Sequence, residues 1–347
     1  GLEARAFYKF TRLAYQNPSL FTDDTHILHS LGLELQQQAA VADWLQLVYG
    51  GNLLADGVDS TAISHKQRLS GGIFLEAPIY LSSFFILTPM ARYDLYSDFP
   101  ASLTYKLTAV LSLSDDASLK ASGGRSYRAP TLNDLFWPND GFMVGNPDLK
   151  PETGYSGDLG VSIVMEWLEA NLFAFVRYVQ DGIQWQDQNP DPDPYAYFGL
   201  PVNIGEALFP GAEADLSFEL LPDLRLNGSY TFLYSFVLKG ASTSYSYADD
   251  KRAIYTPVHA ASAALTYDNG RTRLGANVQV AGERFADEAN ATTLPAYVVV
   301  NAELRKQLTP NLALSLAGKN LLNQVYQTVN GYAMPPFSFW LGAELSL

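Results

Sequence analysis

Carboxylates, amides and stiff prolines are concentrated in one stretch of the sequence, residues 184–195, which reads QWQDQNPDPDPY. Hard cations such as Ca²⁺ take six or more oxygen ligands, and carboxylates spaced by two residues can converge on one ion. The stretch is therefore a candidate calcium site, to which a second oxygen-rich stretch, residues 245–250, can contribute; the alternative is an acidic, solvated loop. The carboxylates of this candidate site are Asp187, Asp191, Asp193, Asp249 and Asp250.

Aromatic side chains are frequent in the same stretches and in residues 136–142. Ligand sites combine aromatic surface with a few placed polar groups, so these rings are candidates for lining a binding vestibule. An aromatic girdle at a membrane interface explains them equally well. Two nearby arginines, Arg252 and Arg284, together with Lys251, supply cations for an anionic ligand. The aromatic candidates are Phe136, Trp137, Phe142, Trp185, Tyr195, Tyr197, Tyr245, Tyr247 and Phe285.

The remaining reactive residues do not suggest catalysis. The four histidines, His26, His29, His65 and His259, lack the spacing of metal ligands, and an offset of three places His26 and His29 on opposite faces of a strand. No Ser-His-Asp or paired-carboxylate constellation can be placed. We therefore expect a protein that is not an enzyme, without a cofactor unless calcium binds in the loops.

Strands must position these residues, because apolar and polar residues alternate with a period of two along the whole chain. In the last segment the odd-numbered residues from Phe337 to Leu347 share an apolar face, and the even-numbered residues from Ser338 to Ser346 share the other. One face suits lipid and the other suits a wet lumen, whose Gly, Ser and Asn residues are unlike the Lys and Glu of a soluble sandwich. The predicted fold class is an all-β, transmembrane antiparallel β-barrel.

Alternation and turn residues mark about 16 segments that reach the length of a tilted spanning strand. Short and long connections alternate, as in outer-membrane barrels with short periplasmic turns and long extracellular loops, so both termini are expected on the periplasmic side. We find no second domain and treat residues 1–347 as one barrel domain. Turns are predicted near residues 38–43, 77–78, 114–117, 165–168, 221–224, 267–270 and 309–311, and loops near 15–25, 50–64, 94–100, 126–153, 183–195, 237–257, 282–295 and 323–336.

Composition excludes several other classes of protein. Although 48% of residues are hydrophobic, no run approaches the roughly 20 apolar residues of a spanning helix. The net charge of −14 argues against a nucleic-acid partner, which needs clustered Lys and Arg. Charged residues make up only 17% and Cys is absent, which suits an envelope barrel. The first residues show no signal-peptide pattern, so any such peptide is expected to be removed or to lie outside this sequence.

Three separated motifs follow one another in the second part of the chain. Residues 125–136 read RSYRAPTLNDLF and residues 145–153 read GNPDLKPET; residues 203–207 read NIGEA and lead into GAE at 211–213; residues 318–326 read GKNLLNQVY and precede GY at 331–332 and the last strand. In sequence and order they resemble the motifs of TonB-dependent outer-membrane receptors. The chain departs from that pattern in having Pro335-Pro336 where Gly-Arg is usual, and Leu347 where an aromatic end is common.

We expect the motif residues to serve folding and register before ligand binding. Prolines fix φ and remove a donor, so they suit loops and the first residues of strands. Lys150 and Glu152 lie two apart, on one side of a strand, where both can face the lumen. The motif residues are Arg128, Pro130, Asn146, Pro147, Leu149, Lys150, Pro151, Glu152, Gly211, Glu213, Asn320, Leu321 and Tyr326.

The resemblance implies a barrel of about 22 strands, filled by an N-terminal plug that carries a TonB-binding box. This sequence contains no plug, and about six strands are missing from the expected number. We favour a chain that is the C-terminal part of a larger receptor, with the plug and first strands elsewhere or on another chain, over a shortened barrel that closes on itself.

The resemblance further implies the bacterial outer membrane as the location, lipid as a partner, and energy from the TonB system delivered through a plug. The expected function is uptake of a scarce nutrient, either an iron-siderophore or a cobalamin-like ligand. Because loop cations are few, a neutral or metal-bearing corrinoid is at least as plausible as an anionic siderophore. The alternative is a passive channel, or a plugless scaffold that docks a partner protein.

Overall fold

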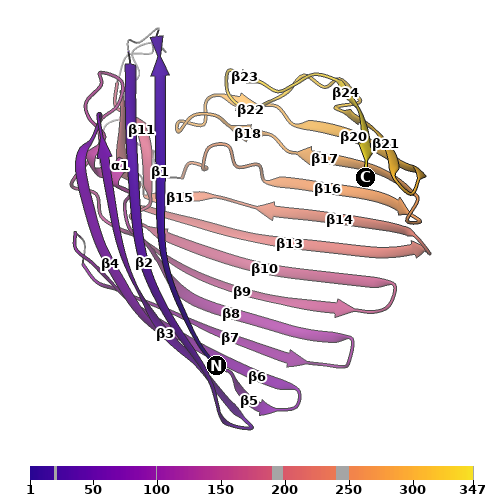
Figure 1. Ribbon diagram of the computed structural model, residues 1–347, viewed down its shortest axis with the longest axis horizontal. Helices are drawn as coiled ribbons and strands as arrows, with labels where there is room; N and C mark the ends of the chain where they lie inside the picture. The colour runs from indigo at the N-terminus through magenta and orange to yellow at the C-terminus, as the bar shows by residue number, and fades with distance from the viewer. Residues whose placement is uncertain (19–21, 99, 190–197, 240–249, 347) are drawn as a thin grey trace.

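The computed structural model describes residues 1–18, 22–98, 100–189, 198–239 and 250–346. These residues form one large antiparallel sheet of 18 strands (Figure 1). In the described ranges no helix has the length and hydropathy that crossing a membrane requires.

The large sheet contains the long strands of the chain and two short ones. In chain order they are β1 (Leu2–Asn17), β2 (Thr22–Ala42), β3 (Leu45–Ser60), β4 (Ser64–Glu76), β5 (Ile79–Ser82), β6 (Phe85–Tyr96), β7 (Ser102–Ser112), β8 (Ala117–Arg128), β9 (Glu152–Val164), β10 (Leu168–Gln180), β13 (Glu206–Leu221), β14 (Leu224–Leu233), β15 (Phe236–Lys239), β16 (His259–Asp268), β17 (Thr272–Ala281), β20 (Tyr297–Thr309), β21 (Leu312–Lys319) and β24 (Ser338–Leu345).

The loops between these strands carry shorter elements at one end of the sheet. They are the helix α1 (Leu132–Phe136) and three hairpins, formed by β11 (Ile183–Asp187) with β12 (Gly199–Asn203), β18 (Arg284–Phe285) with β19 (Thr293–Leu294), and β22 (Gln327–Val329) with β23 (Tyr332–Ala333).

We call each crossing of the sheet by the chain a pass. Each pass pairs with the pass that follows it in the sequence. Two passes are interrupted: β4 and β5 both lie between β3 and β6, and β14 and β15 both pair with β13. Within the described residues the 18 strands therefore amount to 16 passes. This confirms the predicted all-β, antiparallel architecture and its strand number.

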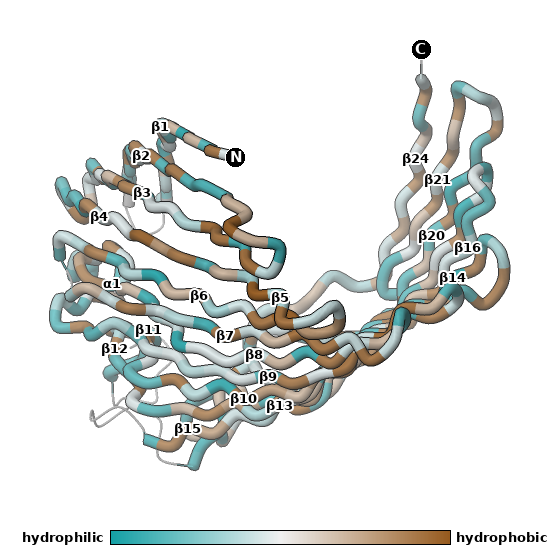
Figure 2. Tube along the Cα trace, turned by 90° about the horizontal axis from the view of Figure 1, so that it is seen from below, coloured by the Kyte–Doolittle hydropathy of each residue, from teal (hydrophilic) through white to brown (hydrophobic). Residues whose placement is uncertain are grey.

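The sheet is curved but open. In the described part of the chain β1 pairs only with β2, and β24 pairs only with β21. Figure 2 shows the two edges standing apart, with the strands between them forming a curved wall. Because a spanning β-structure cannot leave strand edges unpaired in lipid, β1 and β24 need partner strands in a membrane.

The two faces of the wall differ in polarity, as the alternation predicts. On one face Leu33 of β2 lies opposite Leu53 of β3, and both are more than half exposed. On the other face Glu34 lies opposite Asn52. The apolar face is the one that suits lipid, and the polar face is the one that suits a lumen.

Two predicted connections are wrong. The turn expected at 77–78 is an interruption within one pass, because Pro78 has no N–H for the ladder; the chain reverses at residues 83–84 instead. The loop expected at 50–64 is mostly strand, since β3 continues to Ser60. Gly50 is a strand glycine that allows close backbone approach, because a Cβ there would overlap the carbonyl oxygen of Leu35.

Candidate functional site

An outer cap forms at the loop end of the wall, where two loops interlock. We define the outer cap as residues 129–151, which include α1, together with the β11–β12 hairpin; α1 and β11 lie side by side at this end in Figure 1. The two parts are joined by backbone bonds: the N–H of Gly199 donates to the carbonyl of Phe142 at 2.7 Å, and Val144 donates to the carbonyl of Gly199 at 3.0 Å. Segments far apart in the sequence thus become one unit.

Asp134 connects the helix of the cap to the hairpin. Thr131 is the N-cap of α1, and its side chain and that of Asp134 satisfy each other's backbone N–H groups in a capping box. The second carboxylate oxygen of Asp134 accepts a hydrogen bond from the indole of Trp185 on β11 at 3.0 Å. Trp185, expected to line a vestibule, is therefore held by a buried carboxylate.

The Gly-Asn-Pro motif closes the cap. A Cβ on Gly145 would lie 2.5–2.8 Å from backbone atoms of Leu135, Phe136 and Trp137, so only glycine fits. The side chain of Asn146 donates to the carbonyl of Pro201 on β12 at 3.0 Å. The motif therefore packs against both the helix and the hairpin.

The end of the cap is tied to the first residues of β9. Asn203 accepts a hydrogen bond from the backbone N–H of Lys150 and donates to the carbonyl of the same residue, both at 2.9 Å. Glu152 forms an ion pair with Arg128 and accepts from the backbone N–H of Ile183 at 2.7 Å. Leu149 and Pro130 are buried inside the cap. These motif residues contact the cap and the wall, and their role in folding and register stays a prediction.

Two basic residues of β4 attach the cap to the wall. Arg68 donates to the carbonyl of Pro130 at 3.0 Å and forms an ion pair with Asp98 at 2.8 Å. The ammonium of Lys66 lies 4.3 Å from the ring centroid of Phe136, a cation–π contact.

Among the other aromatic candidates, Trp137 is the C-cap of α1 and Phe142 lies in the segment that follows it. The indole of Trp137 donates to Asp140 at 3.1 Å, while Phe142 is exposed. Burial would raise the pKa of Asp140, but hydrogen bonds from the backbone of Phe142, the indole of Trp137 and the backbone of Met143 outweigh it and lower the pKa. Asp140 therefore stays ionised and keeps this turn closed.

Arg252 lies in a second cluster at the same end. Its guanidinium is 5.2 Å from the ring of Tyr234 and 5.3 Å from that of Phe285, so it sits between two aromatic faces. Its backbone exchanges hydrogen bonds with the side chain of Asn290 at 2.8 and 3.0 Å. Its Nε is buried without a hydrogen-bond partner in the described structure. Its Nη2 donates to the carbonyl of Thr256 at 3.3 Å.

Arg284 has a different role. It is only 4% exposed, it donates to the carbonyl oxygens of Gln327 and, at 3.4 Å, Pro295, and it lies 5.1 Å from the ring of Tyr297. This buried side chain therefore joins the loop residues around positions 284, 295 and 327.

The predicted calcium carboxylates are only partly described. One oxygen of Asp187 accepts backbone hydrogen bonds from Asn189 at 2.9 Å and Phe198 at 3.0 Å, and Asp250 has φ 64° in a turn. No group of three or more metal-binding side chains occurs in the part of the chain that the structure describes. Asp191, Asp193, Asp249, Tyr195, Tyr197, Tyr245 and Tyr247 lie outside the described residues.

Glu288, in the loop of the β18–β19 hairpin, lies within electrostatic range of acidic residues of its own loop and of the cap. Burial, followed by the charges of Asp287 and Asp187, raises the pKa of Glu288. Asp287 itself accepts backbone hydrogen bonds from Ala291 at 3.0 Å and from Thr292. Sequence reasoning did not identify Glu288, because only the fold brings it within range of Asp187.

The later motif residues lie on the wall and in the last loop. Asn320, 3% exposed and with φ 50°, donates to the carbonyls of Gln324 and Pro335 at 2.9 and 3.1 Å. The ring of Tyr326 lies 4.5 Å from that of Tyr297. Gly211 lies beneath the ring of Phe175, where a Cβ would overlap it. Glu213, opposite Phe173, and Leu321 are both exposed.

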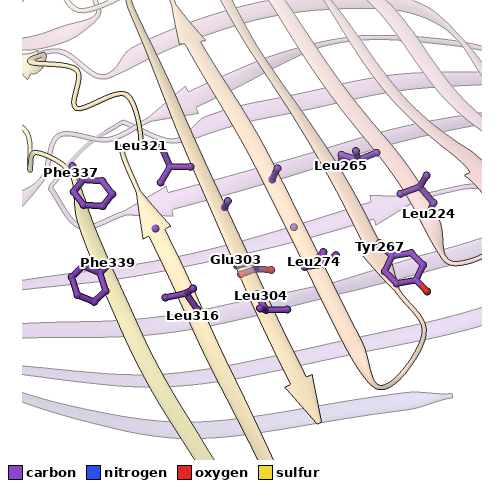
Figure 3. A pocket seen from close by; sticks show the side chains of 14 residues that line it. Leu224, Leu265, Tyr267, Leu274, Glu303, Leu304, Leu316, Leu321, Phe337 and Phe339 are labelled. Atoms are coloured by element: carbon purple, nitrogen blue, oxygen red, sulfur yellow. The ribbon is translucent and has the colours of Figure 1, made fainter. Parts of the chain in front are cut away.

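Hollows on the wall separate by face. One of about 840 Å³ on the polar face, beside β1, is lined by Arg5, Glu34, Asn52 and Arg92, and Arg92 donates to Asn52 at 2.6 Å. One of about 640 Å³ on the apolar face is lined mostly by Leu and Phe side chains of the later strands (Figure 3). The apolar hollow belongs to the lipid-facing face of the wall, and the polar hollow belongs to the opposite face.

Three residues that hold the cap were not predicted as site residues. Arg68 and Lys66 contact the cap from β4, and Asn203 of β12 bonds Lys150 within the cap. Asn203 begins a motif, so its place in NIGEA was an available signal, whereas nothing local distinguishes Arg68 or Lys66.

Known proteins resemble this chain in sequence. A family model described as "TonB dependent receptor-like, beta-barrel" matches residues 4–321. The vitamin B12 transporter BtuB of Photobacterium profundum is 25% identical over 334 residues, covering 90% of this chain and 51% of that protein. The iron-regulated outer membrane virulence protein of Vibrio cholerae is 27% identical over 328 residues, covering 86% and 49%. The chain thus spans about half the length of these relatives.

Solved structures share the fold. The copper transporter OprC superposes with a TM-score of 0.81 at 18% identity, over 100% of this chain and 62% of that one. A mutant of the ferric enterobactin receptor PfeA of Pseudomonas aeruginosa superposes with a TM-score of 0.78 at 18% identity, over 100% and 59%.

Proposed function

The chain belongs to the TonB-dependent receptor family, and on that premise we propose that it forms the wall and outer cap of a receptor for a scarce nutrient. The family assignment places it in the bacterial outer membrane and among transporters rather than enzymes. We further propose that the ligand is an iron-siderophore or a cobalamin-like molecule, and that TonB energises its entry through a plug.

One observation carries this proposal: the outer cap is built from the family motif and stands at the end of a polar-faced wall. Asp134, Asn146 and Glu152 each hydrogen-bond the β11–β12 hairpin, so the two loops present one surface. A rigid loop surface suits ligand capture, because binding then orders few side chains.

The positively charged side chains of the loops bear on the class of ligand. Arg252 lies between two rings, and its guanidinium is the charge that would pair with a carboxylate or phosphate of an anionic ligand. Arg284 is occupied by carbonyl oxygens. A single suitable arginine in the described loops leaves a neutral, metal-bearing ligand as strong a candidate as an anionic chelate.

The proposed partners follow from the unpaired edges of the sheet, β1 and β24, which need further strands. The polar face around Arg92 needs a plug if the lumen is to be closed. We propose that another part of the receptor, or another chain, supplies both.

Uptake by living cells tests the energised part of the proposal. Cells that depend on this receptor are given labelled cobalamin or labelled ferric siderophores, with and without a working TonB. We expect accumulation of one ligand class only when TonB is active. Equal accumulation without TonB would contradict energised transport and favour a passive channel.

A further inference from the structure

An aromatic-histidine cluster lies on the lipid-facing side of β1 and β2. The hydroxyl of Tyr8 lies 2.6 Å from Nδ1 of His29, and their rings stack at 6.0 Å between centroids. The ring of Phe10 lies 5.4 Å from the same imidazole. Tyr8 and Phe10 are 61% and 55% exposed, so the cluster is open to the membrane.

A second cluster repeats this arrangement on β14 and β16. The hydroxyl of Tyr230 lies 2.8 Å from Nδ1 of His259, with ring centroids 6.1 Å apart, and the ring of Phe232 lies 5.6 Å away. The register is the same in both clusters: the phenylalanine is directly opposite the histidine, and the tyrosine is two residues before the phenylalanine. We call the two sets the histidine clusters.

Both histidine clusters mark the outer boundary of the apolar band. From His29 toward the turn end, the same face of β2 carries Leu31, Leu33 and Leu35, which are all more than half exposed. On the loop side of His29, the next cross-strand row on this face consists of the exposed Arg12 of β1, Ile27 of β2 and Asp59 of β3. His259 is the first residue of β16, directly after a loop. Aromatic residues at this level are where lipid headgroups begin.

The hydrogen bond in each cluster engages Nδ1 of the imidazole, so Nε2 is the nitrogen left for another partner. A tyrosine hydroxyl that donates to Nδ1 selects the tautomer with hydrogen on Nε2, and a protonated imidazole carries hydrogen there as well. Neither Nε2 has a protein partner among the residues that the structure describes. A donor at headgroup level needs an acceptor, and phosphate oxygens are strong ones.

We propose that the histidine clusters bind the phosphate groups of anionic lipids in the outer leaflet. Three polar or charged side chains face His29: Tyr8 and Arg12 of β1, and Asp59 of β3. The carboxylate of Asp59 is bonded to His65 at 2.6 Å. Arg12 adds a positive charge beside the first cluster. The lipid-facing position makes a membrane lipid, and not free phosphate, the occupant.

At the second cluster Tyr230 is the polar neighbour from β14. On the opposite side the backbone N–H of Gly282 donates to the carbonyl of His259 at 2.8 Å, and the exposed Glu283 follows it. With no neighbouring cation in this group, lipid should bind here more weakly than beside Arg12.

The four histidines of the chain provide a matched test. The variant H29Q/H259Q removes both clusters, and H26Q/H65Q removes the two histidines that bond Ser60 and Asp59 instead. The whole receptor is reconstituted with equal amounts of phosphatidylglycerol and a neutral galactolipid of the same acyl chains, and retained lipid is measured by native mass spectrometry. We expect the wild type and H26Q/H65Q to prefer phosphatidylglycerol, and H29Q/H259Q to lose about tenfold of that preference.

An unchanged preference in H29Q/H259Q, or an equal loss in H26Q/H65Q, would overturn the proposal. A measurement on the wild type guards against misfolding of the variants: diethyl pyrocarbonate labelling of His29 and His259 should be slowed by phosphatidylglycerol and not by the galactolipid or by inorganic phosphate. Equal labelling in both lipids would also overturn it.

Discussion

At the scale of single residues, the outer cap depends on polar side chains that each bridge two loops. Asp134 completes the capping box of α1 and also accepts from Trp185, so one buried carboxylate holds the helix and the hairpin together. Burial of such a group is tolerated because each oxygen has a donor. The cap should therefore be sensitive to the loss of Asp134 while the wall is not.

Asp134→Ala tests this dependence. Loss of an N-cap partner costs about 1 kcal/mol, and the unpaired indole of Trp185 adds to the cost, so the cap should open locally. We expect faster proteolysis of residues 129–151 and greater solvent quenching of tryptophan fluorescence, with unchanged thermal unfolding of the barrel. Asp148→Ala is the control, because that exposed carboxylate lies in the same loop and bonds no other residue of the described structure. Equal proteolysis of both variants would contradict the bridging role.

Glu288 predicts a dependence on pH. Its pKa is raised by burial, then by the charges of Asp287 and Asp187, so the folded loop binds the proton more tightly than the open loop does. Protonated Glu288 therefore stabilises the packing of the loop fully below the ordinary pKa of a glutamate. This stabilisation is lost as the pH rises through the raised pKa of Glu288. Hydrogen exchange of residues 286–292, corrected for intrinsic rates, should be faster at neutral than at acidic pH.

Glu288→Gln should remove that pH dependence and keep the loop protected at neutral pH. Glu283→Gln, at an exposed position just before the same hairpin, is the control and should behave as the wild type. An unchanged pH dependence in Glu288→Gln would show that another group titrates.

The sequence predicted the role of the motif residues of the cap better than the role of its aromatic residues. Asp134, Asn146 and Glu152 lie in a motif, and the motif alone assigns them to architecture. The aromatic candidates could not be divided between a binding vestibule and an interfacial girdle, because the sequence does not show which residues contact each ring. Trp185 bonds Asp134 and Phe136 lies beneath Lys66, whereas Phe142 is exposed. Ligand contact by these rings remains a prediction.

At the scale of elements, alternation predicts the strands well because one face meets lipid and the other meets water. It fails where a strand carries turn residues for a different reason. Pro78 interrupts a ladder without reversing the chain, and Gly50 provides space for a neighbouring backbone. Local sequence cannot separate these uses from turns, because the deciding contacts come from adjacent strands.

Glycines beneath aromatic rings give a prediction at this scale. A Cβ on Gly160 of β9 would overlap the ring of Phe173 on β10, so Gly160→Val must displace that ring. Overpacking of this kind costs about 1–3 kcal/mol, which should lower the urea midpoint of unfolding in lipid vesicles. Gly228→Val on β14 is the control, since the nearest atom to a Cβ there is 3.9 Å away. Similar midpoints for both variants would contradict the packing role of Gly160.

At the scale of the whole molecule, the open wall separates the two interpretations of the chain. A shortened barrel must bring β1 and β24 together, whereas a larger receptor places other strands between them. The sequence has no cysteine, so an introduced pair of cysteines reports the proximity of β1 and β24 without interference from native cysteines. We expect Tyr8→Cys with Leu341→Cys to remain reduced in the membrane-inserted receptor under oxidation. Efficient disulfide formation would instead support a barrel that closes on itself.

From sequence alone, the alternation and the loop parity indicate the barrel wall, and the motifs indicate the family. The ligand could not be obtained in this way, because the contacts that join the loops of the outer cap connect residues far apart in the sequence. Calcium binding at Asp187 also remains a prediction, since one oxygen of Asp187 already accepts two backbone hydrogen bonds.

Direct ligand binding tests the central claim, that the outer cap of this receptor captures a scarce nutrient. The purified whole receptor is titrated by calorimetry with cyanocobalamin and with a panel of ferric siderophores. We predict saturable binding of one ligand class, weakened by Asp134→Ala and unaffected by Asp148→Ala. Absence of saturable binding by every ligand, together with a large steady conductance in a planar bilayer, would contradict the account and identify a passive channel.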